Sequence, residues 1–254
     1  MIRKTWLLLA LVLALGCRPD AKTALQASSP DAGEPLYVHD DQPIATPPRL
    51  VRLPVVRQAT EYSCGASVAL SILRYYEHAR YARASERSLY TPLHTTPADG
   101  TAPQPITDYL NHEPGLHAEA RWSEDGSRVE LEDLEHAVDR GEPTIVAIQA
   151  WQSVSQRKDL RPWATDWDDG HYVVVIGYDA QNLYFMDPST EGHYTYIPRA
   201  EFLERWHDVL DGNTVRSQHI AIFVHAGASS GAGDAARATP SEAASPAAFV
   251  THIW

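Results

Sequence analysis

The chain has 254 residues, of which 44% are hydrophobic and 21% are charged, and its formal net charge at pH 7 is −12. This amount of apolar material predicts one globular domain with flexible ends rather than two domains. The acidic balance excludes nucleic acid and anionic membrane surfaces as preferred partners, because both select a basic protein face.

Residues 1–16 have the pattern of a signal peptide. Arg3 and Lys4 precede an apolar run at 6–15, and this run ends just before Cys17. A membrane-spanning helix needs roughly 20 apolar residues, so a cleaved export signal is favoured over a transmembrane helix.

The sequence ALGC at 14–17 resembles a bacterial lipobox, in which a cysteine after a small residue is lipidated and becomes the new N-terminus. It departs from the usual box at one position, because Ala14 stands where leucine is common. We expect Cys17 to carry the lipid and to anchor the exported protein to a membrane of the bacterial cell envelope. The alternative is an ordinary secretory signal that is cleaved nearby.

Low sequence complexity at both ends sets the expected domain boundaries. Residues 17–49 are rich in Pro, Ala, Asp and Ser and have no helix or strand period, which predicts a flexible tether. A similar composition predicts a C-terminal tail at 226–254. The folded domain is therefore expected at 50–225.

Helices are expected in the first half of this domain. Ser63 is the expected N-cap of a helix over 64–78, which places Cys64 in the first turn. Pro105 starts a second, short helix that ends at 112, and 131–141 forms a third that closes at a glycine. The inward face of the first helix is predicted to carry Val68, Ile72, Leu73 and Tyr76.

Strands are expected after these helices, at 143–151, 171–178, 183–187 and 219–224. The first is a continuous apolar run, as is typical of a central strand. The second and third form a hairpin around a turn at 179–182. One more helix begins at Pro198 and extends to 208. Helices first and an antiparallel sheet afterwards predict an α+β fold.

Cys64 is the only cysteine after Cys17. If Cys17 is acylated, Cys64 has no partner for an internal disulfide, so it is either buried and inert or kept for its reactivity. An ordinary thiol has a pKa near 8.5 and is mostly protonated at neutral pH. A helix N-terminus and a protonated imidazole both favour the reactive thiolate, and the predicted helix supplies the first of these.

His171 is the histidine whose position suits this role, because it opens a strand directly after the small residue Gly170. An imidazole that acts as both base and acid needs an acceptor at its other nitrogen, and Asp187 at the far end of the hairpin is the candidate. A turn at 179–182 pairs residues whose numbers have an odd sum, which puts the two side chains on opposite faces. Their cooperation therefore requires an odd-length loop or a β-bulge. Otherwise His171 is a polar strand start and Asp187 a turn residue.

Gln58 lies six residues before Cys64, on the loop that leads into the helix. Acyl transfer through a thiolate builds negative charge on the carbonyl oxygen of the substrate. The Gln58 amide and the backbone N–H of Cys64 could stabilise that charge. Taken alone, Gln58 would be an ordinary surface residue.

Together these motifs resemble the C39-like group of papain-like cysteine peptidases: Gln58, Cys64-Gly65, Gly170 to Val175 (GHYVVV), Gly177-Tyr178-Asp179 and Met186-Asp187-Pro188-Ser189. The resemblance extends over about 50–224 and implies a papain-like fold, with N-terminal helices packed on an antiparallel sheet. It implies Cys64 as nucleophile, His171 as general base and acid, Asp187 as its orienting partner and Gln58 as the oxyanion-hole residue. The transporter-fused, bacteriocin-processing members usually carry Asp directly before the cysteine, where Ser63 stands here, so double-glycine leader cleavage is not expected.

Two other features have weaker explanations. The segment DWDDGH at 166–171 has acidic spacings that suit calcium, but the distal Glu of a calcium loop is missing, and we expect neither a metal nor a cofactor. Trp151, Trp163 and Trp167 either line a substrate cleft or cap the core.

The sequence thus predicts a monomeric cysteine peptidase that hydrolyses a peptide amide bond of a peptide or protein substrate, through an acyl-thioester on Cys64. One alternative is a transpeptidase or amidase with the same triad. Another is a non-catalytic binding lipoprotein of the envelope.

Overall fold

The computed structural model describes residues 47–123, 129–151, 162–189, 194–210, 214–227 and 249–250. The helices are α1 (Cys64–Tyr76), α2 (His78–Tyr81), α3 (Pro103–His112), α4 (Leu131–Asp139) and α5 (Arg199–Arg205), with short 3₁₀ helices η1 (Glu86–Leu89) and η3 (Trp163–Thr165). The strands are β1 (Arg49–Leu50), β2 (Leu116–Arg121), β3 (Thr144–Gln149), β4 (Gly170–Tyr178), β5 (Asn182–Met186), β6 (Tyr194–Pro198), β7 (His207–Leu210), β8 (Val215–Gln218), β9 (Ala221–Ala226) and β10 (Phe249–Val250).

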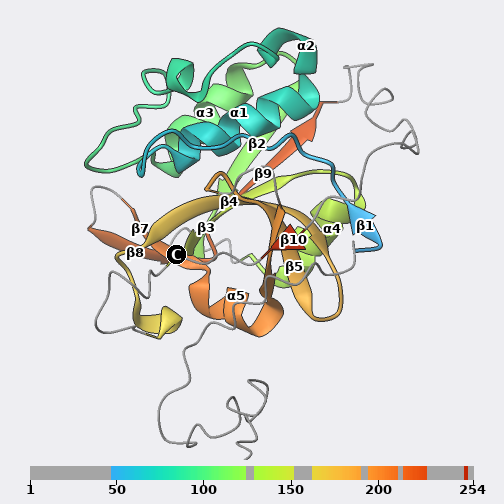
Figure 1. Ribbon diagram of the computed structural model, residues 1–254, viewed down its shortest axis with the longest axis vertical. Coiled ribbons are helices and arrows are strands. Elements are labelled where there is room, and N and C mark those ends of the chain that lie inside the picture. The colour runs from blue at the N-terminus through green and yellow to red at the C-terminus, as the bar shows by residue number, and fades with distance from the viewer. Residues whose placement is uncertain are drawn as a thin grey trace, which may run out of the picture. The chain divides into compact units, whose positions relative to one another are not determined.

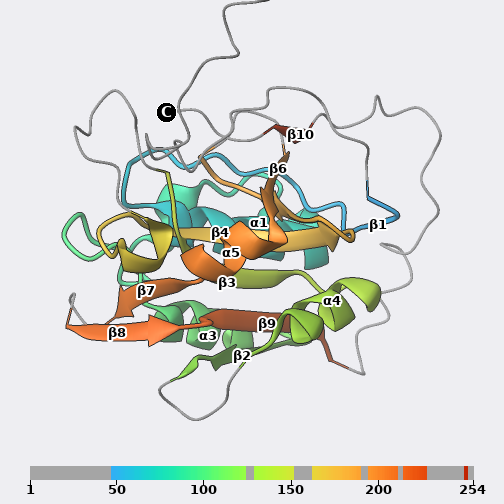
Figure 2. The same cartoon turned by 90° about the horizontal axis from the view of Figure 1, so that it is seen from below.

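An eight-stranded sheet has the order β10-β6-β5-β4-β3-β9-β2, with β1 beside one end of β4 (Figures 1 and 2). All pairs in it are antiparallel except the β10–β6 pair. Strands β7 and β8 form a separate antiparallel ribbon. Strand β10 lies in the segment that the sequence assigned to a low-complexity tail.

Helices cover both faces of the central strands. Figure 1 shows α1, α2 and α3 together on one side of the sheet and α5 on the other. Helix α1 contacts β4, and helices α4 and α5 both contact β3. Every residue of β3 is buried as a result, which explains why its sequence is a continuous apolar run rather than an alternating one. This arrangement is the predicted α+β fold.

Helix α1 begins at Cys64 as predicted, and all its residues from Cys64 to Leu73 are buried. Ser63 is its N-cap residue, but the Ser63 side chain makes no capping hydrogen bond; its hydroxyl lies within hydrogen-bonding distance of the Thr60 carbonyl and of Glu86 instead.

The other helix predictions need correction at their ends. Helix α3 begins two residues before the predicted start, with Pro103 in its first turn, because a proline without an N–H is well placed there. Helix α5 ends at Arg205, and the residues after Trp206 continue as β7 instead of extending the helix to 208. Helix α4 begins at Leu131 as predicted but ends at Asp139, two residues before the predicted end; Gly141 then terminates it with a φ of 75° that favours glycine.

Strand β9, the last strand that the sequence predicts, is not an edge strand. It lies between β3 and β2, and β2, which was not among the predicted strands, occupies the edge. Strands β6, β7 and β8 were also not predicted.

Strands β4 and β5 form the predicted hairpin, and their register contains a β-bulge between Val175 and Gly177. Gly177 is also where β1 crosses close to β4: a Cβ on Gly177 would lie 3.0 Å from the Arg49 carbonyl oxygen. The bulge and the close approach lie at the end of β4 far from His171.

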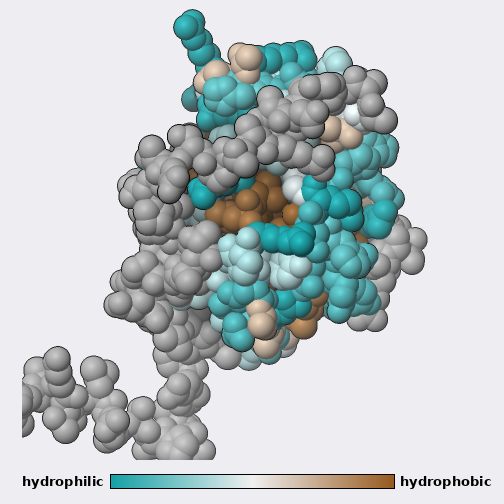
Figure 3. All heavy atoms as spheres, turned by 90° about the vertical axis from the view of Figure 1, so that its right-hand side faces the viewer, coloured by the Kyte–Doolittle hydropathy of each residue, from teal (hydrophilic) through white to brown (hydrophobic). Residues whose placement is uncertain are grey.

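Seen from the right-hand side of Figure 1, the surface has a hollow with apolar side chains at its base and polar residues around it (Figure 3). None of the helices within the described ranges is both long and apolar enough to cross a membrane.

Candidate active site

Cys64 and His171 line one cavity of about 250 Å³. The segment from Asp99 to Pro105 forms the wall on the helical side, and the start of β4 with residues 208–210 of β7 forms the wall on the sheet side. Cys64 is buried and lies in the first turn of α1, where the helix dipole favours a negative charge. Its backbone N–H is one of the first-turn amides that have no acceptor within the helix.

Gly65 explains how the helical wall comes so close to Cys64. A Cβ on this residue would lie 2.7 Å from the Cβ of Thr101. Only a glycine allows that approach, so the Cys64-Gly65 pair shapes the cavity as well as supplying the thiol.

His171 and Asp187 are brought together by the hairpin. The His171 Nε2 and the Asp187 Oδ1 are 2.9 Å apart, and both side chains are buried. Because Nε2 faces the carboxylate, Nδ1 is the ring nitrogen left for Cys64, which lines the same cavity and is close enough to help raise the pKa of the imidazole.

Asp187 is held by several further donors. The Trp151 Nε1 donates to Oδ2 at 2.8 Å. The backbone N–H and the hydroxyl of Ser189 donate to Oδ1 at 2.8 and 2.6 Å. Hydrogen bonds of this kind fix the carboxylate in position and stabilise its ionised form.

The pKa of His171 is raised to about 10. Burial alone would lower it, but the negative charge of Asp187, the hydrogen bond to Asp187 and the contact with Cys64 outweigh burial. A charged imidazole between a carboxylate and a sulfur is the arrangement that stabilises a thiolate and keeps a proton ready for a leaving group.

Gln58 lies on the loop before α1 but is not among the residues that line the cavity. Its backbone N–H donates to the Pro188 carbonyl at 2.7 Å, and its Nε2 donates to the Thr60 carbonyl at 2.9 Å. The amide therefore has a second N–H that this contact does not use. The oxyanion role of Gln58 stays a prediction.

Glu86 on η1 holds the loop before α1 in place by hydrogen bonds, and this loop carries Gln58. Its buried carboxylate accepts hydrogen bonds from the Ala59 N–H at 2.7 Å, from the hydroxyls of Ser63 and Ser67, and from the Tyr90 hydroxyl at 2.7 Å. Sequence reasoning missed Glu86, because its donors come from another part of the chain and no local pattern marks it.

The three tryptophans do not line the cavity. Trp151 bonds Asp187 from behind the site, and the Arg205 guanidinium stacks on both Trp151 and Trp163. Trp167 packs against His207. Of the alternatives for these residues, support of the site and core is therefore the one that the contacts favour. Cys17 lies outside the described residues.

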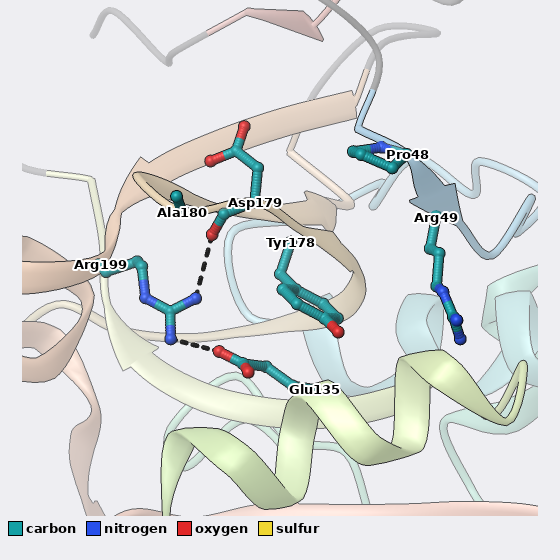
Figure 4. A pocket seen from close by; sticks show the side chains of 7 residues that line it. All are labelled: Pro48, Arg49, Glu135, Tyr178, Asp179, Ala180 and Arg199. Atoms are coloured by element: carbon teal, nitrogen blue, oxygen red, sulfur yellow. Dashed lines mark hydrogen bonds and ion pairs between the residues drawn. The ribbon is translucent and has the colours of Figure 1, made fainter.

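A second cavity, of about 570 Å³, lies at the other end of β4, around Tyr178. In Figure 4 the Arg199 guanidinium reaches both the Asp179 carbonyl and Glu135. Arg49, the other cation in this cavity, pairs with Asp139. The cations here are thus neutralised by the protein itself, which makes this cavity a weaker candidate site than the one around Cys64.

Several solved structures of low sequence identity are similar to this chain. One is a protein from Bacillus anthracis described as a C39-like peptidase, which is 17% identical, with 71% of this chain and 98% of that chain covered and a TM-score of 0.50. Another is the peptidase domain of Streptococcus ComA, a bifunctional ABC transporter of a quorum-sensing pathway, at 19% identity, 69% and 99% coverage and a TM-score of 0.48. A third is a double-glycine-motif protease of an AMS/PCAT transporter in complex with a leader peptide, at 19% identity, 70% and 94% coverage and a TM-score of 0.45. No curated protein matches the chain.

The fold is the papain-like α+β fold of C39-like peptidases. The family model described as Peptidase_C39 like family matches residues 51–211, which include the whole of the cavity around Cys64. The chain belongs to the Peptidase_C39 like family.

Proposed function

We propose that the protein is a cysteine peptidase that hydrolyses a peptide amide bond through an acyl-thioester on Cys64. The observation that supports this most directly is the placing of His171 between Cys64 and Asp187 at the wall of one cavity. Family membership supports a peptidase of this type, and the positions of Cys64, His171 and Asp187 support the roles proposed for them.

The reaction begins with attack of the Cys64 sulfur on the substrate carbonyl carbon, which moves one electron pair onto the carbonyl oxygen. The Cys64 backbone N–H and the Gln58 amide stabilise this oxygen. The His171 imidazolium gives its proton to the amide nitrogen as the C–N bond breaks, so the amine product leaves and a thioester remains. Asp187 holds the ring in position throughout.

Hydrolysis of the thioester then uses His171 in the opposite direction. The neutral imidazole takes a proton from water, and the resulting hydroxide attacks the thioester carbon. Collapse of this second intermediate breaks the C–S bond, which releases the carboxylic acid and restores the Cys64 thiolate, with the proton on His171. The cycle needs no redox partner.

The test is cleavage of a diverse synthetic peptide pool by the full chain, with products identified by mass spectrometry. Wild type is expected to generate new peptide ends, whereas Cys64→Ala generates none and Cys64→Ser retains at most a trace. A peptidyl vinyl sulfone, which traps thiolates, should add to Cys64 in wild type. Cleavage that persists in Cys64→Ala, or a Cys64 that reacts with no peptide probe, would overturn the proposal.

The proposed location is the bacterial cell envelope, with a lipid on Cys17 as the anchor. The ALGC sequence at 14–17 after an apolar run supports it. The substrate would then be a peptide or protein that is met outside the cytosol.

A further inference from the structure

A second carboxylate lies in the cavity that contains Cys64 and His171. It belongs to Asp208 on β7, which lines the cavity together with Gly170 at the start of β4. A Cβ on Gly170 would lie 2.4 Å from the Asp208 Oδ1, so the carboxylate occupies the space that a side chain before His171 would fill. The fold thus makes room for Asp208 beside the proposed nucleophile.

The Asp208 carboxylate is only partly satisfied by the protein. Oδ1 accepts the Val209 N–H at 2.7 Å and the Gln149 Nε2 at 3.2 Å. Within the described parts of the chain, no group donates a hydrogen bond to Oδ2 and no Lys or Arg forms an ion pair with Asp208. One oxygen of a charged group in the cavity wall therefore has unused acceptor capacity.

The rest of the cavity adds negative charge rather than neutralising Asp208. Asp99 lies in the opposite wall, and among the described residues that line the cavity none is Lys or Arg. The imidazolium of His171 is already engaged by Asp187 and Cys64. A cationic group that enters the cavity would meet carboxylates on both sides in a partly water-excluded space, where such contacts are strong.

Burial raises the pKa of Asp208 to about 6, although its hydrogen bonds from Val209 and Gln149 and the charge of His171 act against that rise. The carboxyl is therefore mostly ionised at neutral pH, and its charge is poorly stabilised by its surroundings. Binding of a cation would stabilise it, which is the condition under which such a group contributes to recognition.

We propose that Asp208 is a specificity-determining residue that binds a positively charged group of the substrate, next to the scissile bond. The inference rests on the proposed function of Cys64. A cavity of about 250 Å³ has room for one or two residues of a peptide, since cavities for larger ligands run to roughly 300–1,000 Å³. The cation would be the side chain of Lys or Arg, or a free α-amino group.

A purely structural explanation of Asp208 makes a different prediction. In that case Asp208 would serve to link β7 to Gln149 on β3, which requires an acceptor oxygen but no charge. Asp208→Asn keeps an acceptor oxygen of the same shape and removes the charge. A structural role therefore predicts little change in Asp208→Asn, whereas cation binding predicts that the preference for a cationic substrate is lost.

The experiment measures the rate of adduct formation on Cys64 with N-acetylated peptidyl vinyl sulfones, which differ only by Lys or norleucine at one position before the trapping group. Wild type is expected to react about 10- to 100-fold faster with the Lys probe at one position, as befits a charge-assisted hydrogen bond. The ratio should fall towards 1 in Asp208→Asn. Because the ratio is taken within each variant, a change in thiol reactivity cancels.

Further arms identify the cation and the residue. If the bound cation is a free α-amino group, a norleucine probe with a free α-amino group should react with Cys64 faster than the N-acetylated Lys probe. Asp208→Lys is expected to prefer a Glu probe to the Lys probe. Glu132→Gln serves as the matched control, because it removes one negative charge at a place away from the cavity. Glu132 lies on α4, and this helix is next to the far end of β4, where its Asp139 accepts a hydrogen bond from the Tyr178 hydroxyl. The rate ratio of Glu132→Gln should equal that of wild type.

The outcomes distinguish this inference from the proposed function. Equal rates with all the charged and neutral probes in wild type would overturn the role of Asp208 and leave the peptidase proposal intact. A preference that survives Asp208→Asn but disappears in Asp99→Asn would assign the cation to the opposite wall and overturn the role of Asp208. A Cys64 that reacts with iodoacetamide but with no peptidyl probe would overturn the proposed function itself.

Discussion

His171 and Asp187 meet at 2.9 Å because of an irregularity in the hairpin that joins them. Next to the turn, Tyr178 pairs with Leu183, but beyond the β-bulge Val175 pairs with Phe185. The extra residue in β4 changes the sum of paired residue numbers from odd to even, which brings residues 171 and 187 to one face of the sheet. A regular hairpin with the same turn would place the imidazole and the carboxylate on opposite faces.

Asp187→Asn tests how much Asp187 contributes to the pKa of His171 and to catalysis. The charge and hydrogen bond of Asp187 help to raise the pKa of His171 to about 10, so the imidazolium needed for departure of the amine is lost only above about that pH. The kcat/KM of wild type should therefore fall in the alkaline range, and Asp187→Asn should move that fall towards the ordinary imidazole pKa of about 6.5. We expect kcat to drop by about 10²–10⁴-fold. The measurement is kcat/KM from about pH 5 to 11; an alkaline limb that stays in place would belong to another group.

The sequence predicted those parts of the site that depend on local pattern. The start of α1 at Cys64 follows from an apolar helical period, and the hairpin of β4 and β5 follows from two apolar runs around a turn. The register conflict between His171 and Asp187 was also visible, since strand parity depends only on residue numbers. Parity required a bulge or an odd loop, and the structure has the bulge.

The parts that were missed depend on contacts between distant segments. The sequence around Asp208 predicts the end of a helix. In the structure β7 pairs with β8, so Asp208 is a strand residue that lines the same cavity as His171. Trp151 and Glu86 bond groups 36 and up to 27 residues away, respectively. No spacing rule along the chain predicts such bonds.

Gln58→Ala tests the oxyanion assignment. Loss of one donor to the developing oxyanion should lower kcat by about 10²–10³-fold and leave KM nearly unchanged, because the contact strengthens only in the transition state. Gln218→Ala, which removes an exposed glutamine from β8, is the matched control and should change neither constant. An effect of Gln58→Ala on KM alone would make Gln58 a substrate-binding residue instead.

Glu86→Gln should destabilise the fold and disturb the loop before α1. The Ala59 N–H and the hydroxyls of Ser63 and Tyr90 all donate to one carboxylate oxygen, Oε1, and the Ser67 hydroxyl donates to the other. A neutral glutamine removes the charge that strengthens these hydrogen bonds and places an amide N–H₂ group where Glu86 has an acceptor oxygen. The loss of these charge-assisted hydrogen bonds should lower the free energy of unfolding by about 1–3 kcal/mol.

Urea unfolding of Glu86→Gln and wild type measures this loss. Glu132→Gln, at an exposed position of α4, is the control and should stay within about 0.5 kcal/mol of wild type. Equal stability of Glu86→Gln and wild type would show that the loop does not depend on the charge of Glu86.

Cys17→Ala tests the anchor. Labelled fatty acid fed to cells that express the full chain should enter wild type and not Cys17→Ala, and wild type should sediment with membranes. Cys64→Ala is the matched control for loss of a thiol and should be labelled like wild type. Equal labelling of Cys17→Ala, or a wild type that stays in the soluble fraction, would contradict lipidation at this residue.

Asp208→Asn should make the protein more stable above pH 6. The pKa of Asp208 is raised from an ordinary value of 3.8 to about 6, chiefly by burial, so the folded state holds a proton that the unfolded chain has already released between these pH values. Stability contributed by Asp208 therefore falls as the pH rises from about 4 to 6, and above pH 6 its charge weakens the fold by about 1–3 kcal/mol.

Urea unfolding at about pH 4 and pH 8 checks the sign. At pH 8 the midpoint of Asp208→Asn should exceed that of wild type, and near pH 4 the two should coincide, because both side chains are then neutral. Asp99→Asn, at an exposed carboxylate of the same cavity, should shift the midpoint little at either pH. A less stable Asp208→Asn at pH 8 would mean that the protein already satisfies this charge. If Asp208→Asn is more stable than wild type at pH 8 and has also lost the preference for cationic probes, the charge of Asp208 destabilises the fold and serves substrate binding instead.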